Sequence, residues 1–116
     1  MGRGMRVLDK NGSARLIGVE EILYFSNYHN TIYIHTLEGE FVLPTTLTDL
    51  FAAYKNHGFE RLDRSNVVNI GNISGYDPNR KVVYFSEPSL YATVSEANEK
   101  RIKQYLKSKK EGQPDE

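Results

Sequence analysis

The sequence predicts a mostly β domain with one or two short helices. Short segments rich in Ile, Val, Tyr and Phe recur along the chain, and turn-forming Gly, Pro, Asn and Asp residues separate them. Their spacing of about 8–12 residues is typical of antiparallel β domains. Apolar residues follow the spacing of an amphipathic helix in only two segments, 47–54 and 96–107.

Length and composition indicate one soluble domain. A chain of 116 residues fits a single domain, and its hydrophobic content of 39% is enough for a core. Cysteine is absent, so the chain has neither a disulfide nor a thiolate metal site. No apolar run approaches the ~20 residues of a membrane span, and the N-terminus lacks a signal-peptide core. We therefore expect a cytoplasmic protein that does not associate with a membrane.

The N-terminal half predicts strands joined by tight turns. We expect residues 1–13 to be a flexible leader and residues 14–107 to form the domain. The predicted strands are 15–19, 22–25, 31–36 and 41–43. In the segment 31–36 apolar and polar residues alternate strictly, as in a strand with one buried face. Gly39 can take the positive φ that the tight turn before the last of these strands requires.

A helix is predicted next, because the apolar period changes. Its apolar residues at helical spacing are Leu47, Leu50, Phe51 and Tyr54. Thr46 can cap its N-terminus, Asp49 suits the positive end of the helix dipole, and Gly58 can end it. We expect this helix to support the sheet.

The C-terminal half predicts more strands and a second helix. After a central stretch, 59–73, the predicted strands are 73–77, 81–85 and 90–94, and the terminal helix spans 96–107. The polar tail, 108–116, is predicted to be disordered.

The central stretch consists of a short strand, a polar turn at 64–65 and a second strand over 67–70. Its apolar residues can face a core while Arg and Asn side chains remain in solvent. Arg carries a fork of donors suited to phosphate, and Asn carries the paired donor and acceptor that suit a base edge. The plainer alternative is that these are ordinary edge and turn residues.

This stretch resembles the central motif of the LytTR family, the DNA-binding domains of many bacterial response regulators. The residues shared with the family pattern are Phe59, Arg61, Arg64, Ser65, Val68 and Asn69. The resemblance extends from about residue 16 to residue 106. It implies an elongated stack of small antiparallel sheets that binds double-stranded DNA through loops rather than through a recognition helix.

The resemblance implies DNA contacts from three regions. These are the loop at 28–30, the central motif and the turn after the last strand. In the loop at 28–30, the base-reading position falls on His29 or Asn30. In the central motif it implies that Asn69 reaches the DNA and that Arg64 and Ser65 bind phosphate. The full set of predicted DNA-binding residues is His29, Asn30, Arg61, Arg64, Ser65, Asn69, Ser95, Lys100 and Arg101. The alternatives from the residues alone are a hairpin turn at 29–30, an Asx turn at 69 and a solvated helix face at 100–103.

Two acidic residues depart from the family pattern. Asp63 replaces the family's histidine, and Glu96 stands where a basic residue is common. The formal net charge is zero and the pI is near 6.8, whereas domains that bind nucleic acid are usually basic. The opposing feature is a basic segment, 100–110, that contains no acid.

Two hypotheses of function therefore remain open. The preferred one is a sequence-specific DNA-binding module of a bacterial transcriptional regulator, with two copies on promoter repeats, as a homodimer or together with another regulator. The alternative is a LytTR-like protein-interaction module that pairs with or sequesters another regulator without tight DNA binding.

An enzyme is not expected. No nucleophile lies in an activating context, the three histidines lack metal-ligand spacing, and no Gly-rich phosphate loop is present. The sequence predicts no catalytic residue, metal or cofactor.

Overall fold

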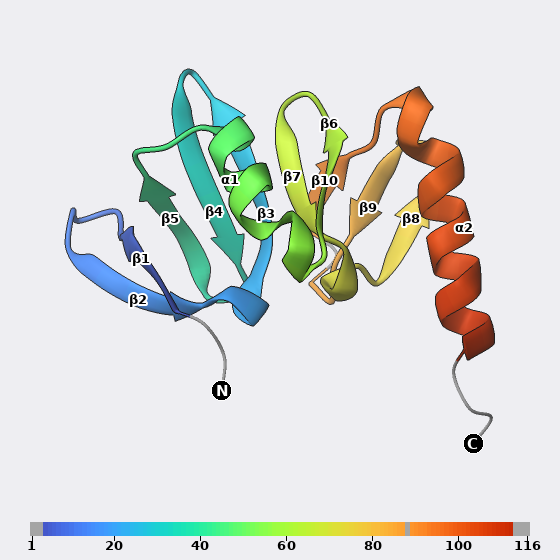
Figure 1. The fold of residues 1–116 in the computed structure, drawn as a ribbon, viewed down its shortest axis with the longest axis horizontal. Coiled ribbons are helices and arrows are strands. Elements are labelled where there is room, and N and C mark those ends of the chain that lie inside the picture. Colours follow the sequence, from blue (N-terminus) through green and yellow to red (C-terminus); the bar gives the residue numbers. More distant parts are fainter. Residues whose placement is uncertain (1–3, 88, 113–116) are drawn as a thin grey trace.

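Two antiparallel sheets lie side by side and build the fold (Figure 1). The computed structural model describes residues 4–87 and 89–112. The molecule is elongated, with extents of 43 × 32 × 27 Å. The prediction of a mostly β fold of antiparallel sheets with two helices is confirmed.

The larger sheet has seven strands in the order β2-β1-β5-β4-β3-β7-β6. In chain order these are β1 (Gly4–Leu8), β2 (Ala14–Gly18), β3 (Ile22–Tyr28), β4 (Thr31–Thr36), β5 (Gly39–Leu43), β6 (Phe59–Asp63) and β7 (Asn66–Asn69). A 3-10 turn, η1 (Val19–Glu21), leads into β3, and another, η3 (Ile70–Asn72), follows β7. Strands β3 and β4 form a hairpin in which Tyr28 pairs with Thr31.

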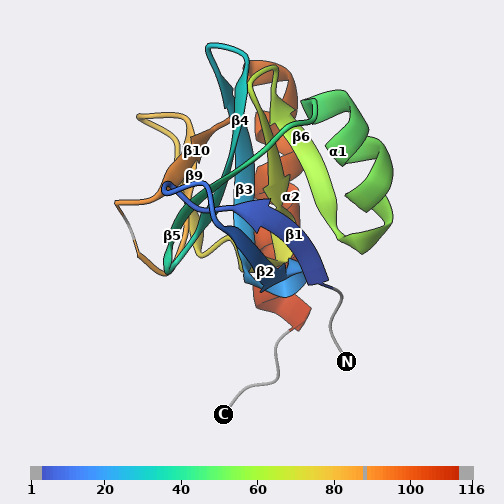
Figure 2. The same ribbon diagram turned by 90° about the vertical axis from the view of Figure 1, so that its left-hand side faces the viewer.

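Helix α1 (Leu47–Tyr54) lies against one side of this sheet, and β9 and β10 of the second sheet lie on the other side (Figure 2). The predicted cap is present, since the Thr46 hydroxyl accepts the backbone N–H of Asp49 at 3.1 Å. A short 3-10 segment, η2 (Lys55–His57), then ends at Gly58, whose φ of 88° favours glycine.

The second sheet has three strands, β8 (Gly75–Asp77), β9 (Val82–Tyr84) and β10 (Tyr91–Thr93), in the order β10-β9-β8. Helix α2 (Glu96–Gly112) follows β10 and packs beside β8. Its apolar stripe is narrow, with Ile102 buried and Tyr105 and Leu106 partly buried.

Strands β3 and β7 separate two hydrophobic cores. In β7, Val67 packs into the core under α1, whereas its neighbour Val68 packs into the core shared with the second sheet. In β3, Ile22 belongs to the first core and its neighbour Leu23 to the second. Because adjacent strand residues point to opposite faces, both faces of these strands are buried.

The structure corrects both ends of the predicted domain. The expected flexible leader contains strand β1, in which Met5 and Val7 are buried while Gly4, Arg6 and Leu8 are exposed. At the other end, α2 continues from residue 107 to Gly112, through residues that favour helix. The rest of the predicted tail, 113–116, lies outside the described residues, as do residues 1–3 of the predicted leader.

Candidate nucleic-acid interface

Three connections that are far apart in the sequence lie along one edge of the molecule. They are the β3–β4 turn, the β6–β7 turn and the link from β10 to α2, all at the top of Figure 1 and again at the top of Figure 2. Backbone hydrogen bonds tie them together: Asn27 N–H donates to the Ser65 carbonyl at 3.0 Å, and Ser95 N–H to the Leu62 carbonyl at 2.8 Å. We call this the three-turn edge.

The β3–β4 turn presents its side chains to solvent. His29 and Asn30 have φ values of 50° and 64°, the positive values that a two-residue type I′ hairpin turn requires at both positions. Both residues are exposed, and the neighbouring Tyr28 is 66% exposed. The two residues therefore form the hairpin turn and also offer polar side chains at its tip.

The β6–β7 turn is organised by the buried side chain of Asn66, which is 2% exposed. Its amide oxygen accepts the backbone N–H of Leu62 at 3.3 Å and of Asp63 at 3.1 Å. Its amide nitrogen donates to the carbonyl of Thr93 at 2.9 Å. One side chain thus closes the turn and joins it to strand β10 of the other sheet.

Asp63 completes this turn. Its carboxylate accepts the Thr93 hydroxyl at 2.7 Å and the Ser65 hydroxyl at 3.3 Å. The carboxylate that replaces the family's histidine is therefore a structural acceptor, and the Ser65 hydroxyl points toward it.

The two arginines of the central motif are placed differently. The Arg61 guanidinium donates to the carbonyl of Arg64 at 3.1 Å and to the Thr48 hydroxyl at 3.4 Å, so it holds the turn from behind. Arg64 is exposed at the tip of the turn. Within residues 4–87 and 89–112 its guanidinium has no hydrogen bond or ion pair.

In the third connection, Ser95 and Asn98 fix the start of α2. The Asn98 amide donates to the Ser95 hydroxyl at 2.9 Å and to the Leu62 carbonyl at 3.1 Å. Arg101 is paired with Glu60 and donates to the side-chain oxygen of Asn98 at 2.6 Å. Lys100, by contrast, is exposed on the helix surface.

Comparison with known proteins agrees with this geometry. The sequence model of the LytTr DNA-binding domain matches residues 12–107. The chain belongs to the LytTR family. One similar solved structure is the LytTr DNA-binding domain of a response regulator from Bacillus cereus, with a TM-score of 0.74 and 16% sequence identity over 89% of this chain and 95% of that chain. No curated protein matches the sequence.

The LytTR family is one of DNA-binding domains and not of enzymes. In the part of the chain that the structure describes, no three His, Cys, Asp or Glu side chains gather as a metal site. None of the described helices is long and apolar enough to cross a membrane.

The predicted DNA-contacting residue Asn69 does not lie at the three-turn edge. Asn69 is 8% exposed, and its amide donates to the carbonyl of Ile22 at 2.9 Å. It also ends β7 at the side away from the three-turn edge, since Asn66 begins that strand beside Ser26. Asn69 and residues 29–30 therefore lie toward opposite ends of the sheet, and the Asn69 amide is engaged by the backbone.

The acidic residues Glu60, Asp63 and Glu96 near the edge are each engaged by another side chain. Glu96 is exposed but lies 3.1 Å from the Lys81 ammonium, and Glu60 is paired with Arg101. Asp63 is engaged by two hydroxyls. Of the basic residues predicted to bind DNA, Arg64 and Lys100 are exposed and have no ion-pair partner among the described residues.

A buried histidine supports the hairpin below its tip. The Nε2 atom of His35 lies 2.8 Å from the Ser26 hydroxyl, and its ring stacks on Tyr24 with centroids 4.0 Å apart. Burial lowers the pKa of His35 below its usual value, and the Glu40 carboxylate, 3.4 Å from Nδ1, opposes this in part. The Nδ1 atom is buried and has no hydrogen-bond partner.

We predict that Asn66→Ala lowers the free energy of unfolding by about 1–3 kcal/mol, because it leaves buried backbone groups of the turn without partners. Urea denaturation followed by circular dichroism measures this. The control is Asn56→Ala at an exposed position of η2, for which we expect a change within about 0.5 kcal/mol. Equal stability of both variants would contradict the role given to Asn66.

We predict that His35 makes the LytTR domain less stable in mild acid. Its folded-state pKa is lowered, so the unfolded chain binds the proton more readily. The free energy of unfolding therefore falls as the pH drops through the unfolded-state pKa of about 6.5 toward the lower folded-state value. Urea titrations between about pH 7.5 and about pH 5.5 should show a shallower pH slope in His35→Gln than in wild type. The control variant His57→Gln, at an exposed site, should retain the part of the pH slope that His35 contributes. Equal slopes in His35→Gln and wild type would refute the assignment.

Proposed function

We propose that the chain is a sequence-specific DNA-binding module of a bacterial transcriptional regulator, and that the three-turn edge contacts the duplex. The observation that carries the proposal is that three connections meet on one edge and that the β3–β4 and β6–β7 turns present exposed polar and basic side chains there. Loops on a rigid β scaffold can follow the grooves of DNA without a recognition helix.

The proposed contacts divide into two kinds. Arg64 and Lys100 bind phosphate oxygens, which positions the protein on the duplex and strengthens binding to any sequence. His29 and Asn30 read base edges, since their side chains carry directional donors and acceptors at a turn tip. Ser65 of the β6–β7 turn and Ser95 of the link from β10 to α2 contribute hydroxyl groups from the other two connections.

Arg61 and Arg101 have a different part in the proposal. Their guanidinium groups already bond to the turn carbonyls and to Glu60, so they position the edge rather than grip the DNA. Asn66 acts in the same way from the interior. The DNA-facing set is thus smaller than the number of Arg and Asn residues in the sequence implies.

We further propose that two copies occupy repeated promoter sites, as a homodimer or beside another regulator, in the cytoplasm.

The alternative is an interaction module that sequesters another regulator without tight DNA binding. This alternative depends on repulsion between DNA and the carboxylates of Asp63 and Glu96. The hydrogen bonds of Asp63 and the ion pair of Glu96 with Lys81 weaken that argument. A mobility-shift titration at low salt separates the two, because no shift at tens of micromolar protein on promoter or random DNA would favour the alternative.

We predict that Arg64→Ala weakens binding to all duplexes alike. Loss of one phosphate contact should reduce the slope of log affinity against log salt by about one unit. Fluorescence anisotropy with labelled promoter and random duplexes at several salt concentrations measures both effects. Lys55→Ala is the matched control, because Lys55 is an exposed cation in η2, outside the three-turn edge. An unchanged slope in Arg64→Ala would remove the phosphate role.

We predict that Asn30→Gly relaxes sequence preference. Glycine accepts the φ of 64° at this position, so the turn persists while the amide is lost. Discrimination between the preferred site and a site with one changed base pair should fall by about 1–3 kcal/mol, with little change on random DNA. Competition binding on a library of single-base variants tests this. The same preference in Asn30→Gly and wild type would leave His29 as the candidate reader on this turn.

A further inference from the structure

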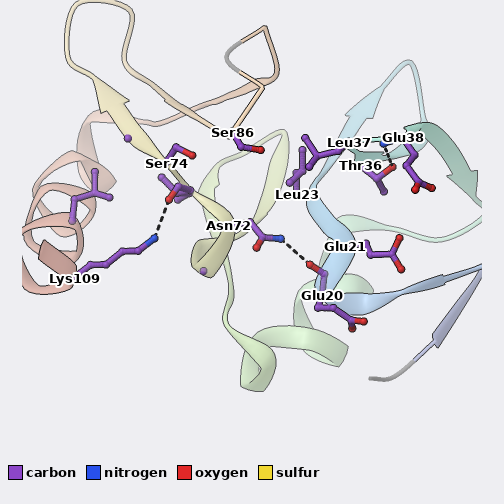
Figure 3. A pocket seen from close by; sticks show the side chains of 14 residues that line it. Glu20, Glu21, Leu23, Thr36, Leu37, Glu38, Asn72, Ser74, Ser86 and Lys109 are labelled. Carbon is purple, nitrogen blue, oxygen red and sulfur yellow. Dashed lines mark hydrogen bonds between the residues drawn. The ribbon is translucent and has the colours of Figure 1, made fainter. Parts of the chain in front are cut away.

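A groove opens on the side of the molecule opposite the three-turn edge. It has a volume of about 830 Å³ and lies between the two sheets. One wall comes from η1 and the β4–β5 turn, and the other from η3, the start of β8 and the C-terminal part of α2 (Figure 3).

The groove combines an apolar floor with an acidic wall. Leu23, Ile73 and Leu106 line it, and Leu37 stands at the β4–β5 turn with 58% of its surface exposed. The acidic residues are Glu20, Glu21 and Glu38, all exposed and all on the η1 and β4–β5 side. Within the described residues, none of these three carboxylates has an ion-pair partner.

Among the described residues that line the groove, the one cation is on the other wall. Lys109 of α2 donates to the backbone carbonyl of Ile73 at 3.2 Å, as Figure 3 shows, and does not neutralise the carboxylates. A nucleic acid would be repelled by this acidic wall. The described residues also offer no three-ligand metal site here.

The groove is held open by hydrogen bonds that cross its base. The Asn72 amide of η3 donates to the carbonyl of Glu20 at 3.0 Å and to that of Ile22 at 2.9 Å. Glu21 is fixed in turn, because its carboxylate accepts the backbone N–H of Gly18 at 3.0 Å. A preformed groove spends less free energy on ordering when a ligand binds.

We propose that this groove docks a protein segment that presents lysine or arginine beside apolar side chains. The apolar side chains of the segment pack against the exposed Leu37 and the partly buried Leu106, over a floor formed by the buried Leu23 and Ile73. Its cationic groups face Glu20 and Glu38. Charge complementarity selects this occupant over an acidic one. Because the groove is remote from the three-turn edge, the segment binds with or without DNA, so the inference stands apart from the proposed DNA binding.

The test uses a short fluorescein-labelled peptide in which Leu and Arg alternate with Ala, and a control peptide with Glu in place of Arg. Fluorescence anisotropy of the full chain should show saturable binding of the first and none of the second. Glu20→Gln combined with Glu38→Gln should weaken binding about three- to tenfold. Leu37→Ser should also weaken it, and because Leu37 is exposed the fold should be unaffected.

The matched control is Asp49→Asn, an exposed acid on α1 outside the groove, which should bind the peptide as wild type does. Mobility shifts on DNA should be the same for all these variants, which separates this site from the three-turn edge. The proposal fails if the glutamate double variant binds like wild type, or if Asp49→Asn weakens binding equally. It also fails if a second copy of the chain fills the groove. Analytical ultracentrifugation would then show self-association of the wild type that the glutamate double variant abolishes.

Discussion

The amide of Asn66 is the interaction on which the geometry of the three-turn edge depends. It closes the β6–β7 turn through two backbone N–H groups and reaches across to Thr93 in the other sheet. The same turn carries Arg64 at its tip and bonds through Ser65 to the β3–β4 hairpin. Since a buried amide of this kind has few alternative partners, it fixes the relative position of three connections that the chain order keeps apart.

The sequence predicted those features that depend on local pattern. The alternation over 31–34 in β4, the helical spacing from Leu47 to Tyr54 and the Thr46 cap were all readable, because each needs only neighbours along the chain. The burial of His35 and Thr36 at the end of β4 was not predicted. Strand β1 was not, because its short alternation lies among Gly and Arg and is stabilised by pairing with β2 and β5. Likewise, the donor and acceptor of Asn66 and Asn69 suit a base edge and a backbone equally. Only contacts with residues 27 and 47 positions away show that they serve the backbone.

The neutral total charge of the chain does not describe the local charge at the three-turn edge or at the groove. Arg64 and Lys100 lie at the three-turn edge, where the nearby acids Glu60, Asp63 and Glu96 are each engaged by another side chain. The carboxylates of Glu20, Glu21 and Glu38 gather at the groove, at the other end of β3 and β4. In the proposed DNA complex the groove with its carboxylates faces away from the duplex, so the two proposed surfaces do not overlap.

Asp63 shows how a departure from the family pattern can preserve the edge. A histidine at this position could contribute a positive charge, whereas the carboxylate accepts hydroxyls from Ser65 and Thr93 and so stiffens the turn. A stiffer turn loses less conformational freedom when Arg64 meets a phosphate, which offsets part of the lost attraction. Both effects act within the β6–β7 turn. Arg61 and Asn66 also bond to the backbone of this turn, at Arg64 and Asp63. In the proposed DNA complex, fewer side chains therefore contact the duplex, and the internal bonds of the turn hold them in place.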